Sequence, residues 1–201
     1  FKQKTAYEIM PSLVGSEMCI RDRQILRKGF VAFLDGLWWG LRDTVGALSM
    51  YEGYAGGFRQ IGEELAEQMG GKGADAAASI ATAIMRALGL DARQEGKEIV
   101  VKSCPIWDRI LERGLEYAFH VEKICWAPLL EGIGKKTGTK AVVKSSLRLA
   151  YVERAKAEYK KAKAKKSLDS GAMTQDEYEQ LVKSMDERLS KIVDEGRYAF
   201  E

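Results

Sequence analysis

The sequence has few cysteines and histidines, and it has no long apolar run. Its 201 residues include three cysteines and one histidine. A sparse, odd set of cysteines favours a reducing cytoplasm over a secreted domain that is held together by disulfides. No apolar segment reaches the ~20 residues of a membrane-spanning helix, and Asp35 interrupts the longest one, at 29–39. We therefore expect a cytoplasmic protein with no membrane span.

The chain also lacks a strong excess of charge. It carries 32 Lys and Arg residues against 29 Asp and Glu residues, for a formal net charge of +3. The most basic segment, 156–166, is diluted by Glu158 and contains Tyr159 as its one aromatic residue. Such a pattern is typical of a solvated helix face, so we expect no nucleic acid partner.

The first 23 residues, FKQKTAYEIMPSLVGSEMCIRDR, lack both a helical and a strand period. They also lack the apolar core and the cleavage site of a signal peptide. The stretch resembles translated sequencing-adapter read-through at the ends of metagenomic gene fragments, most closely around SLVGSEMCIRDR. We expect residues 1–23 to be an artefact or a disordered tail, and Cys19 to be no functional thiol.

Residues 24–150 change from helical to extended periodicity along the chain. Apolar spacing predicts helices over 30–41, 51–69 and 74–88, separated at Gly46 and at GGKG, 70–73. Strands are predicted on both sides of the turn at Glu95 and Gly96, and over 139–151. Further helices are predicted over 107–118 and 121–133, the second bent at Pro128. Strands and helices without a regular alternation indicate an α+β domain with a small antiparallel sheet.

The composition changes at Tyr151, where a charged helix with few large apolar residues begins. After Gly171, Thr174 and Glu177 have the spacing of a capping box at the start of another helix. That helix carries an apolar stripe of Tyr178, Leu181, Val182, Met185 and Leu189. The stripe is too small to be stable alone and needs a partner surface, from the same chain or from a second copy. We therefore predict for 151–201 a charged helix, a self-associating helical hairpin that makes a homo-oligomer, and a charged tail.

The segment 168–189 resembles the short C-terminal domain found at the ends of many bacterial and archaeal proteins. The pattern is a leucine, a loop ending in glycine, an apolar residue, a threonine, an acidic pair, an aromatic residue and a leucine. These are Leu168, Gly171, Met173, Thr174, Asp176, Glu177, Tyr178 and Leu181. The resemblance implies an oligomerisation or tethering element and no catalyst.

Residues 30–150 contain a glycine-rich YEGYAGGFRQIGEELA stretch, a strand ending at Cys104 and Pro105, and a second thiol, Cys125, in a helix. This order resembles the vinyl-reductase-type small-molecule-binding domain of predicted hydrocarbon-binding proteins, and it implies a small hydrophobic ligand. Amino-thiazoline-carboxylate hydrolases are similar in the Cys-Pro segment, which implies a cysteine-dependent hydrolase instead. Both families often have a further cysteine near the last strand, where this chain has Ser145 and Ser146.

Aromatic side chains and thiols are dense in this domain. Glycines interleave with the rings near Tyr54, and glycine on a helix leaves room for a ligand or allows a close helix crossing. The residues predicted to line a ligand cavity are Trp38, Tyr54, Phe58, Cys104, Trp107, His120, Cys125 and Trp126. The alternative is that these rings form an ordinary packed core.

A catalytic site is the second possibility. Cys104 precedes a predicted helix N-terminus, which favours a thiolate, although Asp108 in the first turn opposes it. A hydrolase would use Cys104 with His120 and an acid such as Asp108. His120 and Cys125 lie about 140° apart on a helix, and their spacing matches no zinc site, so we expect no metal. The sequence identifies no cofactor.

These observations favour a non-catalytic binder or sensor of a small hydrophobic or aromatic ligand, which self-associates through its C-terminal hairpin. The alternatives are the cysteine-dependent hydrolase and a purely structural interaction protein whose hairpin is the active part. Whether the chain is an enzyme stays open.

Overall fold

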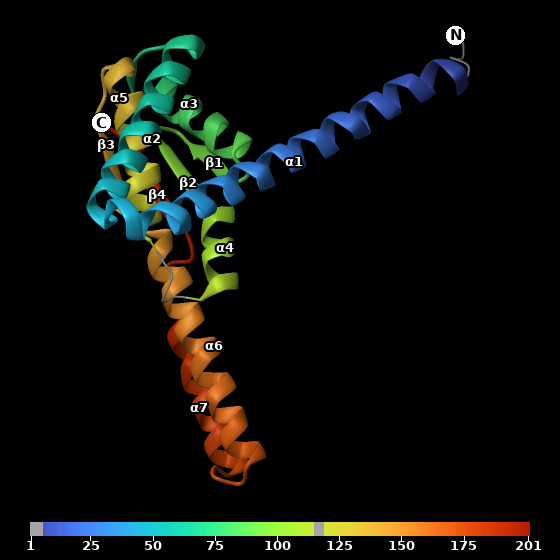
Figure 1. Ribbon diagram of the computed structural model, residues 1–201, viewed down its shortest axis with the longest axis vertical. Coiled ribbons are helices and arrows are strands. Elements are labelled where there is room, and N and C mark those ends of the chain that lie inside the picture. Colours follow the sequence, from blue (N-terminus) through green and yellow to red (C-terminus); the bar gives the residue numbers. More distant parts are fainter. Residues whose placement is uncertain (1–5, 115–118) are drawn as a thin grey trace.

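The chain folds into a helix-rich body with two long projections (Figure 1). The computed structural model describes the backbone of residues 6–114 and 119–201, and the side chains of residues 20–114 and 119–201. In chain order the elements are α1 (Ala6–Val45), α2 (Ala47–Met69), α3 (Gly73–Ala87), β1 (Asp91–Glu95), β2 (Glu98–Ser103), α4 (Pro105–Arg113), the π-helix η2 (Glu122–Trp126), α5 (Ala127–Thr137), β3 (Ala141–Ser145), α6 (Leu147–Asp169), α7 (Gln175–Leu189) and β4 (Gly196–Phe200). This content confirms the predicted α+β class.

Glycines end several helices where the sequence predicts it. The backbone is left-handed at Gly46 between α1 and α2, with φ +85°, and at Gly70 after α2, with φ +68°. Helix α4 differs from the predicted 107–118, because it starts at Pro105 and ends at Arg113, before Gly114, whose φ is +116°. Residues 115–118 lie outside the described residues.

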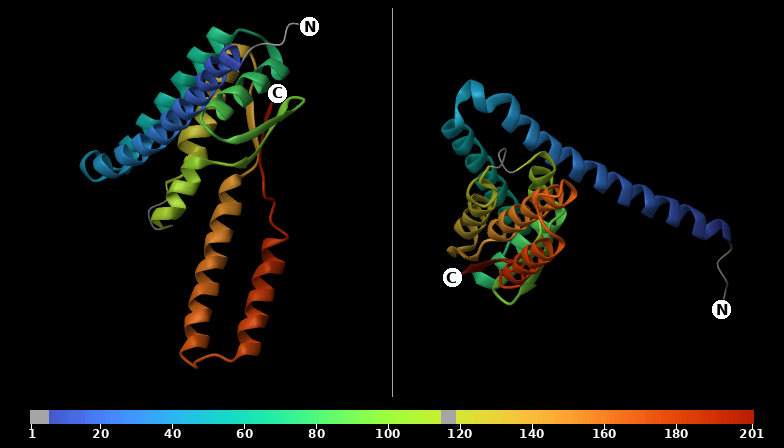
Figure 2. Two further views of the ribbon diagram at one scale, coloured as in Figure 1. Left: turned by 90° about the vertical axis from the view of Figure 1, so that its right-hand side faces the viewer. Right: turned by 90° about the horizontal axis from the view of Figure 1, so that it is seen from below.

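The first helix differs from the prediction for residues 1–23. Helix α1 begins at Ala6 and runs unbroken to Val45, where we expected no regular structure before residue 24. Residues 20–23 are exposed, and this end of α1 extends away from the body (Figure 2). An α-helix satisfies its backbone hydrogen bonds within itself, so the backbone of this extension leaves no donor or acceptor unpaired between its ends. That the stretch is sequencing read-through stays a prediction.

The predicted helix over 121–133 contains one irregular turn. Residues 122–126 form a π-helical turn, in which the N–H of Ala127 donates to the carbonyl of Glu122, and α5 then continues to Thr137. Pro128 has no N–H and so donates no hydrogen bond to the preceding turn. The irregular turn thus lies directly before Pro128, where the sequence predicts a bend.

The strands form one antiparallel sheet in the order β1-β2-β4-β3. The prediction of a charged C-terminal tail is wrong for residues 196–200, because β4 lies between β2 and β3. In this strand Tyr198 and Phe200 face the core, while Arg197 lies on the opposite face. The predicted strand over 139–151 is also too long, since α6 already begins at Leu147.

The hairpin of α6 and α7 is therefore an insertion between two neighbouring strands, and the boundary predicted at residue 150 falls inside α6. Thr174 and Glu177 form the predicted capping box at the start of α7. The apolar stripe of α7 is half-buried, and α6 contributes Ala157 and Ala164 to the buried seam between the two helices. The stripe thus has a partner within the chain, and self-association through the hairpin stays a prediction.

The core lies between the sheet and the helices α2, α3 and α5. Helices α2 and α5 cross backbone to backbone: a Cβ added at Gly62 would lie 2.2 Å from the carbonyl oxygen of Leu129, and one at Gly132 would lie 2.2 Å from that of Arg59. By contrast, a Cβ at Gly53, Gly56 or Gly57 would meet nothing within 4 Å. The close helix crossing is therefore at Gly62, and the three other glycines face open space.

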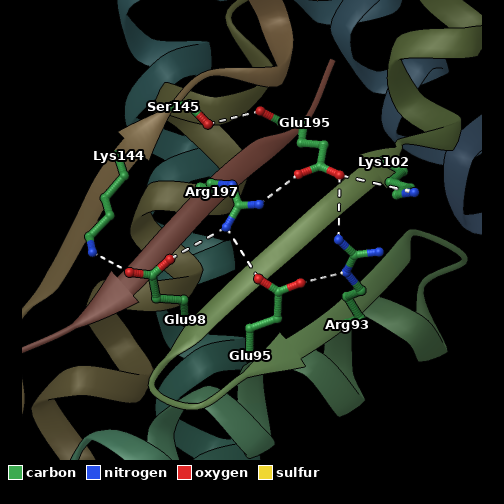
Figure 3. A network of polar contacts seen from close by, with 8 residues as sticks. All are labelled: Arg93, Glu95, Glu98, Lys102, Lys144, Ser145, Glu195 and Arg197. Atoms are coloured by element: carbon green, nitrogen blue, oxygen red, sulfur yellow. Dashed lines mark hydrogen bonds and ion pairs between the residues drawn. The ribbon is translucent and has the colours of Figure 1, made fainter. Parts of the chain in front are cut away.

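The other face of the sheet carries a polar network (Figure 3). Arg197 lies at its centre, 2.9 Å from Glu195, 3.2 Å from Glu95 and 3.7 Å from Glu98. Below these side chains Val100 has no exposed surface, since the apolar stems of the long charged residues cover it. The charges neutralise one another, so this face is a solvated structural surface.

Candidate functional site

Seven of the eight predicted ligand-binding residues lie in a single buried cluster. They are Trp38, Tyr54, Phe58, Cys104, Trp107, Cys125 and Trp126. They come from α1, α2, η2 and α4 together with the residue that precedes α4, so the tertiary structure brings together what the sequence spreads over almost 90 positions. His120 is partly exposed and lies outside this cluster. We refer to the seven residues as the ring cluster.

The rings of the cluster contact one another directly. The Trp38 ring centroid lies 4.8 Å from that of Phe119 and 6.1 Å from that of Tyr54. Phe58 and Trp126 meet edge to face at 5.6 Å. These are the separations of packed aromatic pairs. The rings thus fill much of the space that a ligand cavity would need.

The hollows at the surface lie elsewhere. Five hollows at the surface of the described residues have volumes of roughly 400–730 Å3. None of these five is lined by a residue of the ring cluster. The side chains of the ring cluster are at most 8% exposed, and these five hollows do not open onto them. A molecule could enter the ring cluster only if the rings moved apart.

Both thiols of the cluster are buried and protonated at neutral pH. Cys104 precedes the first turn of α4 and Cys125 lies in η2, and neither has any exposed surface. Burial raises the pKa of Cys104 to about 12 and raises that of Cys125 well above its ordinary value, and each neighbouring charge that acts on them adds to the rise. A protonated thiol is a poor nucleophile and behaves as a small apolar group with a weak donor.

The remaining residues of the hydrolase hypothesis have separate structural roles. The Nδ1 atom of His120 accepts a hydrogen bond from the backbone N–H of Lys123 at 3.4 Å. Burial, followed by the charge of Arg148, lowers the pKa of His120, so the imidazole is neutral at pH 7. Within the described residues, no hydrogen bond joins it to the thiol of Cys104 or the carboxylate of Asp108.

Asp108 and Cys104 are joined through Tyr151 instead. The hydroxyl of Tyr151 donates to the carboxylate of Asp108 at 2.9 Å and accepts from the backbone N–H of Cys104 at 3.1 Å. Its ring stacks on Trp107 at 5.8 Å. These contacts fix the start of α4 against α6, so Asp108 here holds a helix in place.

A second polar cluster, which the sequence analysis missed, surrounds Glu122. Its carboxylate is buried and accepts hydrogen bonds from the backbone N–H of Leu147 at 2.7 Å, from the hydroxyl of Tyr198 at 3.0 Å and from the hydroxyl of Ser146. An acidic group at this place satisfies the free N–H groups at the start of α6 and interacts favourably with the helix dipole. Glu122 thereby ties η2, α6 and β4 together. The serine before Leu147 is a cue for a helix start, but no local pattern indicates a capping group 24 residues earlier.

A similar clamp holds α4 to α1. The buried carboxylate of Asp35 lies 3.2 Å from the guanidinium of Arg109 and 2.8 Å from that of Arg113. The sequence analysis treated Asp35 only as an interruption of an apolar run. Burial of the carboxylate is possible because both cations compensate its charge.

Three donors of the ring cluster have no acceptor. The indole N–H groups of Trp38, Trp107 and Trp126 are buried and make no hydrogen bond with any described residue. The Trp126 indole lies near the Cys104 sulfur, a weak acceptor, but does not reach the geometry of a hydrogen bond. A buried donor without a partner costs about 1–3 kcal/mol, and native proteins contain few of them. Three such donors in one cluster are an unusual concentration for a protein core.

The described residues contain neither a metal-binding group of side chains nor a membrane-spanning helix. No three His, Cys, Asp or Glu side chains among them form a group that could hold a metal ion. None of the helices in the described ranges combines the length and the apolar character needed to cross a membrane.

Comparison of the chain with known protein families, with curated proteins and with solved structures gave no match. The resemblances to small-molecule-binding domains, to hydrolases and to the short C-terminal domain therefore stay predictions.

Proposed function

We propose that the chain binds a small, uncharged, mostly apolar molecule within the ring cluster and does not transform it chemically. The observation that supports this proposal is the set of three buried indole donors without acceptors. Around them the cluster offers apolar contact area from its rings and aliphatic neighbours. This combination of an apolar lining and a few polar groups is typical of small-molecule sites.

The chemistry of the cluster limits the class of ligand. Its free groups are hydrogen-bond donors, namely indole N–H and protonated thiols, so the ligand needs an acceptor such as a carbonyl or ether oxygen. The buried charged side chains of the described chain are Asp35 and Glu122, and both are already paired. A charged ligand would therefore be buried without compensation, at a high cost in free energy.

The cysteine-dependent hydrolase is the less favoured alternative. It needs a thiolate and a base within hydrogen-bond reach. Burial raises the pKa of Cys104 to about 12, and His120 is bonded to the backbone of its own segment. The closed packing of the rings favours a different second candidate, a structural interaction protein with no ligand at all.

A ligand titration tests the proposal. The probes are acetophenone, which carries a carbonyl acceptor, and ethylbenzene, which has a similar shape but no acceptor. We expect 1 mM acetophenone to raise the melting temperature by roughly 3–6 °C if its dissociation constant is ~0.1 mM, and ethylbenzene to raise it less. The preference should disappear in Trp126→Phe and persist in Trp39→Phe, whose ring lies over Arg42 outside the cluster.

Native mass spectrometry of the protein purified from cells complements the titration, since it reports a retained ligand directly. If no molecule were retained and neither probe raised the melting temperature, ligand binding would be refuted. The structural interaction protein would then be the favoured function. Equal stabilisation by both probes would retain the apolar site but refute the role of the indole donors.

A further inference from the structure

The outer face of α1 is the least covered apolar surface of the described chain. Of the twelve large apolar side chains that are exposed there, six lie in α1, between residues 20 and 45. Leu26 is 72% exposed and Phe33 is 63% exposed. Phe33 lies on the side of the helix away from Val31, Leu34 and Trp38, which face the core. Leu26 lies at the edge of that side, where it lines a surface hollow with Phe30 and the end of α3. This outer face has no partner within the described residues.

Three glycines lie on the same face. A Cβ added at Gly29, Gly36 or Gly40 would meet nothing within 4 Å. Glycine weakens an exposed helix relative to alanine, and packing within the chain gives no reason for it at these positions. On a helix surface, glycine allows a second backbone to approach closely.

The spacing of these residues matches the contact face of a helix pair. Leu26, Gly29, Phe33, Gly36 and Gly40 follow one another at intervals of three and four residues. This is the 3.5-residue repeat of two helices that pack along their length.

Four of these five positions are also complementary to one another when one copy is reversed. About a two-fold axis between residues 34 and 35, Phe33 of one copy lies opposite Gly36 of the other, and Gly29 lies opposite Gly40. Each bulky ring thus meets a residue without a side chain, twice by symmetry. An isologous dimer needs such self-complementarity.

We propose that this face of α1 binds the same face of a second copy in an antiparallel helix pair. Ile25, Leu26 and Phe33 expose between them the equivalent of about two complete large side chains per copy. At roughly 100 Å2 per side chain, and with about 60% of an interface apolar, the pair would bury roughly 650 Å2 in total. That area is below the ~1,200 Å2 of stable complexes, so the dimer should be weak and depend on concentration.

Sedimentation velocity of the full chain from about 1 to 200 µM tests this inference. We expect the mean mass to rise toward twice the chain mass across this range. Phe33→Gly and Gly36→Phe should each weaken dimerisation at least tenfold, the first by removing the ring and the second by placing two rings opposite each other. The double variant, Phe33→Gly with Gly36→Phe, exchanges the positions of the ring and the glycine and should restore the dimer.

Two controls locate the interface. Leu149→Glu changes a comparably exposed residue on α6 and should leave the mass unchanged. Tyr178→Glu in the hairpin should also leave it unchanged, and circular dichroism must show that each variant is folded. A monomer at 200 µM, a dimer that survives both single changes, or a dimer that only Tyr178→Glu disrupts would overturn the proposal. Failure of the double variant to dimerise would overturn the antiparallel register.

Discussion

Replacement of Gly62 by alanine is the most direct test of the packing in this fold. The added Cβ would lie 2.2 Å from the carbonyl oxygen of Leu129, 3.1 Å from its carbonyl carbon and 3.2 Å from the backbone nitrogen of Ile133. A carbon and a carbonyl oxygen normally stay more than ~3.3 Å apart. Because all three atoms belong to the backbone of α5, no side-chain rotation relieves the clash, and α2 and α5 must separate by about 1 Å.

The magnitude follows from two opposing terms. Overpacking of a core costs about 1–3 kcal/mol, and a clash with an unyielding backbone belongs at the upper end of that range. Alanine regains about 1 kcal/mol through its better helix propensity. We expect a net loss of about 2 kcal/mol in the free energy of unfolding, which for a chain of this length lowers the melting temperature by roughly 4–8 °C.

The chain provides a matched control in Gly56, which lies in the same helix where a Cβ meets nothing within 4 Å. Gly56→Ala should raise the free energy of unfolding by about 0.5–1 kcal/mol. Urea unfolding, followed by circular dichroism and tryptophan fluorescence, measures both variants. If Gly62→Ala proved as stable as Gly56→Ala, the two helices could not cross where the structure places them.

Gly132 extends the test to the other helix, since a Cβ there would lie 2.2 Å from the carbonyl oxygen of Arg59. Gly132→Ala should lower the free energy of unfolding by a similar amount. One separation of the helices relieves both clashes, so the double variant with Gly62→Ala should lose less than the sum of the single changes. Strict additivity would show that the two glycines do not share one contact.

Three further predictions concern the polar groups that hold the fold. Glu122→Gln should lower the free energy of unfolding by about 2 kcal/mol in urea, because the carboxylate accepts three hydrogen bonds at the start of α6; unchanged stability would contradict this role. Burial raises the pKa of Cys104 from its ordinary value of 9 to about 12, so the unfolded chain loses the thiol proton at a lower pH than the folded chain. The free energy of unfolding should therefore fall as the pH rises from 9 to 12. If it fell equally steeply in the wild type and in Cys104→Ala, this linkage would be refuted. Thr174→Ala removes the capping box and should cost about 1 kcal/mol, seen as faster hydrogen exchange in the first turn of α7 while the sheet keeps its protection.

Local signals made much of the fold predictable. Gly46 and Gly70 mark helix ends because the backbone there is left-handed, which residues with a side chain avoid. Thr174 and Glu177 start α7 through hydrogen bonds that span three residues. The ring cluster was also predictable as a set of buried residues, because large apolar side chains are buried in a folded domain.

Strand β4 shows where local signals fail. Its sequence, GRYAF, alternates inward and outward residues, but it follows a charged helix and is only five residues long. A strand is stable only through hydrogen bonds to other strands, and the partners of β4 lie more than 50 residues earlier in the chain. A separation of 24 and 25 residues likewise hid the pairing of Glu122 with Ser146 and Leu147 at the start of α6.

The sequence by itself determined where most of the helices lie, where several of them end and which large side chains are buried, since helix periodicity, capping and hydrophobicity act over a few residues. Only the tertiary structure decided that Tyr198 and Phe200 complete the sheet, that α2 and α5 touch at Gly62, and that the rings contact one another while their indole donors lack acceptors. These features depend on distances between segments far apart in the chain, and such distances follow from the packing of the whole molecule.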